Sequence, residues 1–201
     1  MSDSSDRKLK TKSILANNSE KTLFLKLKKH KDRQAFIEVY DLYLEPIYRF
    51  VYFKVGDKAQ AEDLTSQVFL KCWSCIQDGK ITDYQTIRAF LYKVARNTVI
   101  DYYRQNRVEL SLDDENALDV EDRSQGQVDK LDIELTMDMV KEQLLQLKDE
   151  YREALILKFI NELSISEIAD ILGKTKGNVR VLLHRATEAL KNLVTKQEKH
   201  E

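Results

Sequence analysis

Apolar residues recur at spacings of three and four along most of the chain, which is the pattern of helices that bury one side. In the first half of the chain, helices are expected at residues 22–29, 33–55, 59–77 and 86–106. Pro46, the only proline, lies inside the second of these helices and should kink or divide it. The pattern resumes over residues 135–193, and alternating Val/Ile/Thr runs that predict strands are missing. The sequence therefore predicts an all-α fold.

The segment at residues 164–193 is predicted to form two helices joined by a tight turn. Ser164 and Glu167 have the spacing of a capping box, and Gly173 is placed to end the first helix in a left-handed conformation. Thr175 can cap the second helix. The apolar stripes of the two helices are Ile165, Ile168, Ala169 and Leu172, and Val179, Leu183, Ala186, Leu190 and Leu193. This arrangement is typical of a helix-turn-helix.

Polar side chains of the second helix in this hairpin lie largely off its apolar stripe. They are Lys176, Asn178, Arg180 and Arg185. In a helix-turn-helix the second helix enters the major groove with its N-terminal residues toward the base edges. The pattern therefore favours duplex DNA binding, and the alternative is an ordinary helical hairpin with solvated charges.

The formal net charge of −1 hides a segregation of charge along the chain. Residues 108–134 carry a net charge of −8, whereas residues 84–107 and 173–201 each carry +4. Basic zones supply the phosphate contacts that dominate nucleic-acid affinity, and an acidic stretch without periodicity tends to stay unfolded. The expected organisation is two small helical domains joined by a tether: a disordered basic arm (1–19), a helical domain (20–107), a flexible acidic linker (108–134) and a helix-turn-helix domain (135–195).

The predicted helix at residues 86–106 has one apolar side and one side on which aromatic and cationic residues alternate. The second side consists of Arg88, Tyr92, Lys93, Arg96, Asn97, Tyr103 and Arg104. Flat rings stack on unpaired bases and cations follow the phosphate backbone, so this row is typical of a surface for single-stranded DNA. The alternative interpretation is a solvated basic face.

Neither a metal site nor an enzyme active site is indicated. Cys72 and Cys75 form a C-x-x-C pair, but their spacing with Leu64 and Val68 places them on one apolar helical side, where core packing is favoured. No phosphate-binding glycine loop, metal-ligand cluster or nucleophile motif is present, so no catalytic residues and no cofactor are expected. No apolar stretch is long enough to cross a bilayer, and a cytoplasmic protein is expected.

Three motifs in fixed order give the chain a resemblance to bacterial RNA polymerase sigma factors of the extracytoplasmic-function group. The motifs are Ala61-Glu62-Asp63-Leu64 running to Val68-Phe69-Leu70-Lys71-Cys72-Trp73, then Phe90-Leu91-Tyr92-Lys93-Val94-Ala95-Arg96-Asn97 to Asp101-Tyr102-Tyr103-Arg104, and last Ile165-Ser166-Glu167-Ile168-Ala169 to His184-Arg185-Ala186. A chance hairpin would not bring the other two motifs with it. The resemblance implies a protein that binds core RNA polymerase and promoter DNA and directs promoter recognition and melting.

The resemblance also assigns a role to each surface. Core polymerase binding is expected at Glu62, Asp63, Ser66 and Gln67. Contacts with the opened minus-ten element are expected at Arg88, Tyr92, Lys93, Arg96, Asn97 and Arg104, preceded by the connector 79–85. Contacts with the minus-thirty-five duplex are expected at Lys176, Asn178, Arg180, His184 and Arg185. An inhibitory anti-sigma factor is a further expected partner, and the polymerase would perform the chemistry.

The chain departs from the family pattern at two places. Ser66-Gln67 stand where many members carry Gln-Glu on the polymerase-binding helix. Arg180-Val181-Leu182 stand where Lys-Ser-Arg is frequent on the recognition helix, which removes a possible guanine or phosphate contact.

Two other classes of protein compete with the sigma factor. A two-domain repressor or activator would need an apolar ligand pocket or a dimer stripe in its first domain instead of the basic aromatic row. An adaptor that binds only proteins would leave both basic zones unused. Association with core polymerase and promoter-specific transcription separate the three classes.

Overall fold

A computed structural model describes residues 20–84, 86–113 and 140–197, and these residues contain helices and connecting turns but no strand. The named elements are α2 (Arg33–Val55), α3 (Lys58–Gln77), the 3-10 turn η1 (Lys80–Asp83), α4 (Ile87–Asp113), α6 (Asp149–Leu155), the π-helical η2 (Ile156–Ile160), α7 (Ile165–Leu172) and α8 (Lys176–Gln197). Short helices also cover residues 20–30 and 140–145. The predicted all-α fold is confirmed. The basic arm 1–19 and most of the acidic linker lie outside the described residues.

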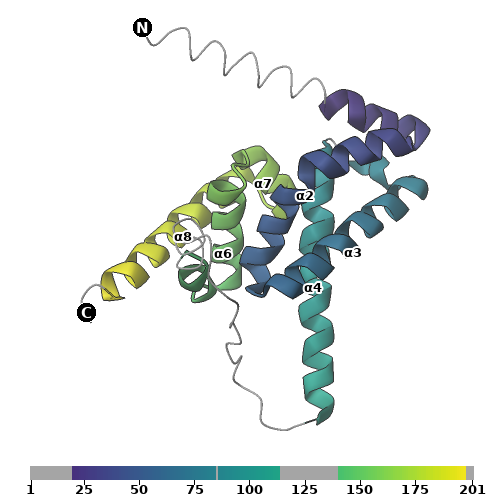
Figure 1. Cartoon of the computed structure of the whole chain (residues 1–201). Coiled ribbons are helices and arrows are strands. Elements are labelled where there is room, and N and C mark those ends of the chain that lie inside the picture. The colour runs from purple at the N-terminus through teal and green to yellow at the C-terminus, as the bar shows by residue number, and fades with distance from the viewer. Residues whose placement is uncertain (1–19, 85, 114–139, 198–201) are drawn as a thin grey trace, which may run out of the picture.

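The helices up to α4 form an N-terminal unit, which covers residues 20–113 (Figure 1). Asp32 caps α2 by accepting hydrogen bonds from the backbone of Gln34 and Ala35, and Asp57 caps α3 through Gln60. Gly56 separates α2 from α3 in the left-handed conformation, with φ of 81°. Pro46 does not divide α2, which continues as one element to Val55.

Helix α4 is longer than the sequence predicted. It continues to Asp113, so it includes the first residues of the stretch assigned to the acidic linker. Periodicity underestimated its length because the residues beyond Asn106 lack a regular apolar stripe.

The C-terminal unit covers residues 140–197 and contains the predicted helix-turn-helix. The Ser164 hydroxyl accepts a bond from the backbone N–H of Glu167 at 3.2 Å, and the Glu167 carboxylate accepts one from the Ser164 N–H at 2.8 Å. Gly173 has φ of 65°, and Thr175 caps α8 through Asn178. The predicted capping box, left-handed turn and second cap are confirmed. Phe159 and Val140 of this unit are exposed.

Loss of the capping box should weaken the C-terminal unit. Ser164→Ala removes the acceptor for Glu167 and is expected to lower the free energy of unfolding by about 1 kcal/mol. Ser164→Asp keeps an oxygen at this position and should remain within a few tenths of the original value. Chemical denaturation measures both changes. Equal stability of the alanine and aspartate variants would contradict the assigned role of the cap.

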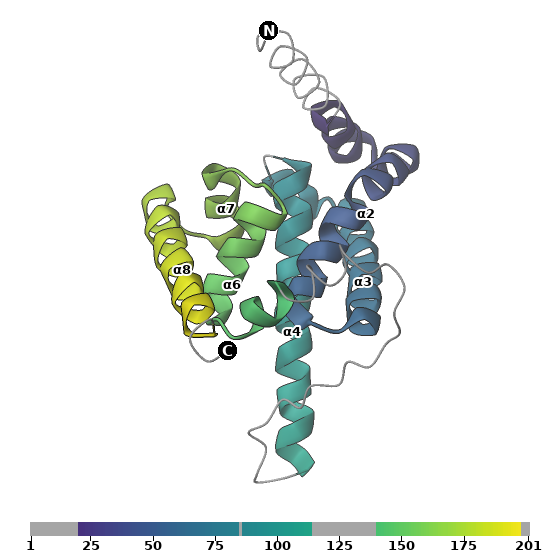
Figure 2. The ribbon, with the colours of Figure 1, turned by 60° about the vertical axis from the view of Figure 1, so that its left-hand side comes forward.

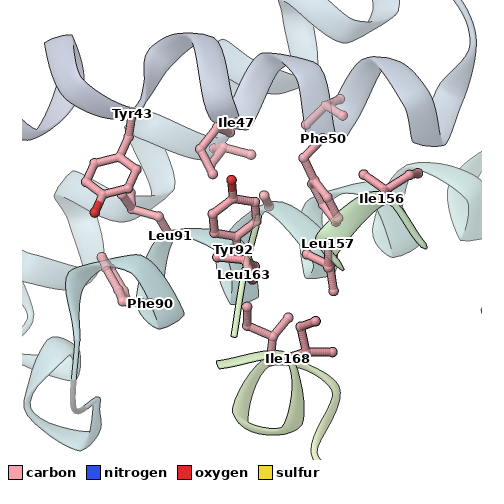
Figure 3. Close-up of a cluster of buried hydrophobic side chains, with 14 of the residues drawn as sticks. Tyr43, Ile47, Phe50, Phe90, Leu91, Tyr92, Ile156, Leu157, Leu163 and Ile168 are labelled. Atoms are coloured by element: carbon pink, nitrogen blue, oxygen red, sulfur yellow. The ribbon is translucent and has the colours of Figure 1, made fainter. Parts of the chain in front are cut away.

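The two units pack side by side, with α3 and α8 on opposite sides of the molecule and α4 and α6 between them (Figures 1 and 2). Buried apolar side chains of both units form one continuous cluster. In Figure 3, Tyr92 of α4 lies among Ile47 of α2 and Leu157 and Leu163 of the C-terminal unit. At the same junction, a Cβ added to Gly56 would lie 3.2 Å from the Leu145 side chain. We call this packing the closed arrangement.

Candidate nucleic-acid interface

The first turns of α8 present the predicted recognition face. All five predicted side chains are exposed: Lys176, Asn178, Arg180, His184 and Arg185. Val179 and Ala186 are fully buried against the unit, so they fix which side of α8 faces outward. The helix therefore offers cations and hydrogen-bonding groups along one free side near its N-terminus, as groove recognition requires.

The row predicted on α4 does not form one exposed surface. Asn97 and Arg104 are exposed and Lys93 is half-buried, but Tyr92 is completely buried. Its ring meets Phe50 edge to face at a centroid distance of 5.5 Å, and burial raises the pKa of its hydroxyl to about 12. The prediction that Tyr92 is an accessible stacking residue is wrong for this structure. Helix α4 is covered by α2 and α3 on one side and by the C-terminal unit on another, and periodicity within one helix does not predict the second contact.

Two arginines of the same row form ion pairs with the C-terminal unit. The Arg88 guanidinium lies 3.5 Å from Glu167 of α7, and Arg96 Nε donates a hydrogen bond to Glu153 of α6 at 3.0 Å. Both arginine side chains remain about one-third exposed. In the closed arrangement, carboxylates of the C-terminal unit therefore occupy both guanidinium groups.

Glu153 belongs to a charge cluster at the junction of the two units, formed with Lys54, Arg96 and Asp149. Lys54 is 2% exposed, and its ammonium group lies 2.6 Å from Asp149 and 4.0 Å from Glu153. Burial acts to raise the pKa of Asp149, but Lys54 and Arg152 outweigh it and lower that pKa below its ordinary value. Because two charges are almost fully buried, the cluster depends on the units staying together.

An open recess lies beside the half-buried end of the α4 row. It is lined by Cys75, Lys80, Tyr84, Ala89, Phe90, Lys93 and Asp170. The Tyr84 and Phe90 rings meet edge to face at 5.0 Å, and two lysines stand at the same recess. Aromatic rings beside ammonium groups suit a base and its phosphate. Asp170 comes from α7, so the C-terminal unit also borders this recess.

The outward side of α3 contains the residues predicted to bind polymerase. Glu62, Asp63, Ser66 and Gln67 are all exposed, whereas Leu64, Val68 and Cys72 are buried, as their spacing indicated. Leu70 is 71% exposed on the same outward side, one turn beyond Ser66 and Gln67. Burial raises the pKa of the Cys72 thiol, which makes it unreactive, and Cys75 is half-buried.

Two features of these surfaces were not predicted from the sequence, and a third was predicted only as part of the connector 79–85. Leu70 falls outside the buried stripe of α3, and this offset was a signal that it is exposed. Lys54 falls on the buried stripe of α2 after Ile47 and Phe50, which predicts a buried charge in need of a partner. Lys80 and Tyr84 lie in the connector 79–85 that was expected to precede the minus-ten surface, but their recess with Phe90 forms only through the fold.

Residues 20–84, 86–113 and 140–197 contain no helix with the length and apolar character needed to span a membrane. In that part of the chain, no three or more His, Cys, Asp or Glu side chains are grouped so that they could hold a metal ion.

Comparison with protein families identifies both units. The family described as Sigma-70 region 2 matches residues 39–109, and the family described as Sigma-70, region 4 matches residues 137–190. The matches fall on α2 to α4 and on the helix-turn-helix. They define a class of protein that is built from these two regions of a sigma factor.

Similarity to individual sigma factors shows to which group of this class the chain belongs. The ECF RNA polymerase sigma factor SigW of Bacillus subtilis is 31% identical over 83% of this chain and 92% of its own length, and SigM of the same organism is 30% identical over 78% and 93%. BldN of Streptomyces coelicolor is 33% identical over 81% of this chain, which spans 61% of the BldN length. The chain belongs to the extracytoplasmic-function group of RNA polymerase sigma factors, which direct promoter recognition in transcription initiation.

Solved structures show the same fold. CnrH, in complex with the cytosolic domain of CnrY, matches 89% of this chain and 98% of its own with a TM-score of 0.64 at 18% identity. The sigma factor RpoE of Bartonella quintana, in complex with the anti-sigma factor NepR, matches 80% of this chain and 96% of its own with a TM-score of 0.65 at 24% identity.

Proposed function

We propose that this sigma factor divides its work among three surfaces. Glu62, Asp63, Ser66 and Gln67 on α3, together with Leu70, bind core polymerase. Lys176, Asn178, Arg180, His184 and Arg185 on α8 bind the minus-thirty-five duplex. Arg88, Lys93, Arg96, Asn97 and Arg104 on α4, with the recess at Lys80 and Tyr84, hold the opened minus-ten strand. The observation that carries this division is the exposure of α3 and α8 on opposite sides of the molecule, which lets both act at once.

Use of the minus-ten surface requires the closed arrangement to open. Arg88 and Arg96 are paired with Glu167 and Glu153, and Asp170 borders the recess. A phosphate would meet these carboxylates before it reached the arginines, and like charges repel. We therefore propose that the C-terminal unit leaves α4 when the protein joins polymerase and promoter. The free energy for this step comes from the new polymerase and DNA contacts.

We further propose that the protein works in the cytoplasm and has no active site of its own, since the polymerase performs the chemistry. An anti-sigma factor is the expected inhibitory partner, because RpoE, which shares this fold, is bound by the anti-sigma factor NepR. A partner that stabilises the closed arrangement would keep α4 covered and thereby prevent promoter opening.

Reconstitution tests the proposed function directly. The full chain is mixed with core RNA polymerase and a promoter library, and run-off transcripts are sequenced. Specific transcripts that depend on the chain, together with co-elution with core enzyme, are the expected result. Absence of both would reject the proposal. Operator binding without co-elution would favour the repressor class instead.

A charge change on α3 should weaken polymerase binding without affecting DNA contacts. Asp63→Lys is expected to weaken co-elution with core enzyme at least tenfold, because reversal of an interface charge costs more than about 1.4 kcal/mol. Asp41→Lys, at an exposed position of α2, makes the same charge change elsewhere and serves as the control. Equal polymerase affinity of the two variants would exclude Asp63 from the interface.

A further inference from the structure

The recognition helix α8 contains an exposed valine that does not belong to the core of the folded chain. Val181 is 51% exposed, whereas the next residue, Leu182, is only 7% exposed. Val181 and Leu182 stand where a polar pair is frequent in the family, and the reason for an apolar residue differs between the two positions. Leu182 serves the core of the C-terminal unit. Val181 lies on the outward side among Arg180, His184 and Arg185.

A β-branched residue on an exposed helical side is unfavourable in the free protein, since its rotamers are restricted and its methyl groups face water. The edges of the bases in the major groove present hydrogen-bonding groups and one prominent apolar group, the C5-methyl of thymine. If the recognition face binds duplex DNA, a valine at its centre is chemically matched to that methyl group and to no other base-edge group.

Gly177, one turn before Val181, supplies a second and independent observation. Its φ lies outside the left-handed region, and a Cβ at this position would meet only the Thr175 hydroxyl, at 3.8 Å. Neither backbone conformation nor packing therefore requires glycine, which is among the least favourable residues in a helix. What remains is the close approach of a group from outside the chain to the backbone of α8.

We propose that α8 reads a thymine of the minus-thirty-five element through the methyl groups of Val181, and that Gly177 lets the first turn of α8 approach the DNA closely enough for this contact. The proposal rests on the proposed function, because it assumes that α8 enters the major groove. Arg180 and Arg185, on the same face, would hold the helix against the phosphates.

Deoxyuridine, which lacks only the methyl group, tests the contact. The holoenzyme is bound to a promoter selected from the library, and each thymine of the minus-thirty-five element is replaced in turn by deoxyuridine. Replacement at one of these positions should weaken binding about fourfold, as expected for loss of one buried methyl group. Holoenzyme with the Val181→Ser substitution should bind promoters with thymine or deoxyuridine at this position equally well. The control Val194→Ser changes an exposed valine far along α8 and should discriminate thymine from deoxyuridine as the original protein does.

Substitution of Gly177 is a second test, in which the stability of the protein and its affinity for the promoter should change in opposite directions. Gly177→Ala should raise the melting temperature of the protein, because alanine favours the helix and meets no clash, yet it should weaken promoter binding at least tenfold. Unchanged promoter affinity would reject the close approach. A Val181→Ser variant that still discriminates thymine from deoxyuridine, or an original protein that never does, would reject the thymine contact. If the proposed function were wrong, no promoter would be selected from the library. That result is distinguishable from loss of the thymine contact on a selected promoter.

Discussion

Glu153→Ala is expected to open the closed arrangement. The substitution removes the hydrogen-bond acceptor of Arg96 and one of the two carboxylates near the buried Lys54. Loss of one partner from a buried ion pair costs roughly 3–5 kcal/mol, and the lower end applies here because Lys54 keeps Asp149. Since these groups come from different units, the loss acts on the contact between the units. Small-angle X-ray scattering should show a larger radius of gyration.

Glu150→Ala is the matched control for this experiment. Glu150 lies on the same helix, and its ion pair with Lys174 at 2.8 Å stays within the C-terminal unit, with both side chains at least one-third exposed. Its loss should cost less than about 1 kcal/mol and leave the radius of gyration unchanged. If Glu153→Ala is as compact as Glu150→Ala, the charge cluster does not hold the units together.

The double variant Arg88→Ala, Arg96→Ala should lose promoter opening. Contacts between charged groups contribute about 1.5–3 kcal/mol each, so removal of two guanidinium groups should reduce opening roughly 100-fold or more. Permanganate reactivity of thymines in the minus-ten region measures opening in the holoenzyme. Binding of the minus-thirty-five duplex should stay close to that of the original protein, because α8 is unchanged.

Two comparisons separate the role of these arginines in DNA binding from their role between the units. Glu153→Ala breaks the Arg96 pair from the other side but keeps the guanidinium, so it should still open promoters. Arg33→Ala, Lys71→Ala removes two positive charges from exposed or half-exposed positions of α2 and α3 and should also open promoters. Normal opening by the arginine double variant would exclude both arginines from the minus-ten contact.

Local signals explain what could be predicted from the sequence. The helix-turn-helix followed from Ser164, Glu167, Gly173 and Thr175, because capping and left-handed turns depend on neighbours within four residues. The outward face of α3 followed from the spacing of Leu64, Val68 and Cys72 for the same reason. In both places the buried residues of a helix form one stripe, which is the case that periodicity describes.

Contacts between the units could not be predicted in this way. Tyr92 is polar at one end and lies off the main stripe of α4, so a single-helix pattern placed it in solvent, although Leu157 and Leu163 cover it. The partners of Arg88 and Arg96 lie more than fifty residues away in the sequence. Only the arrangement of complete helices brings these carboxylates to α4.

Gly56 gives the protein a site at which opening can be adjusted without any change of charge. A side chain here would press on Leu145, and its left-handed backbone would add strain. Related chains that differ at this one position could therefore share promoter contacts and polymerase contacts while differing in how readily they respond to an inducing signal. Selection at a residue outside the three proposed binding surfaces could thus set the threshold of the response.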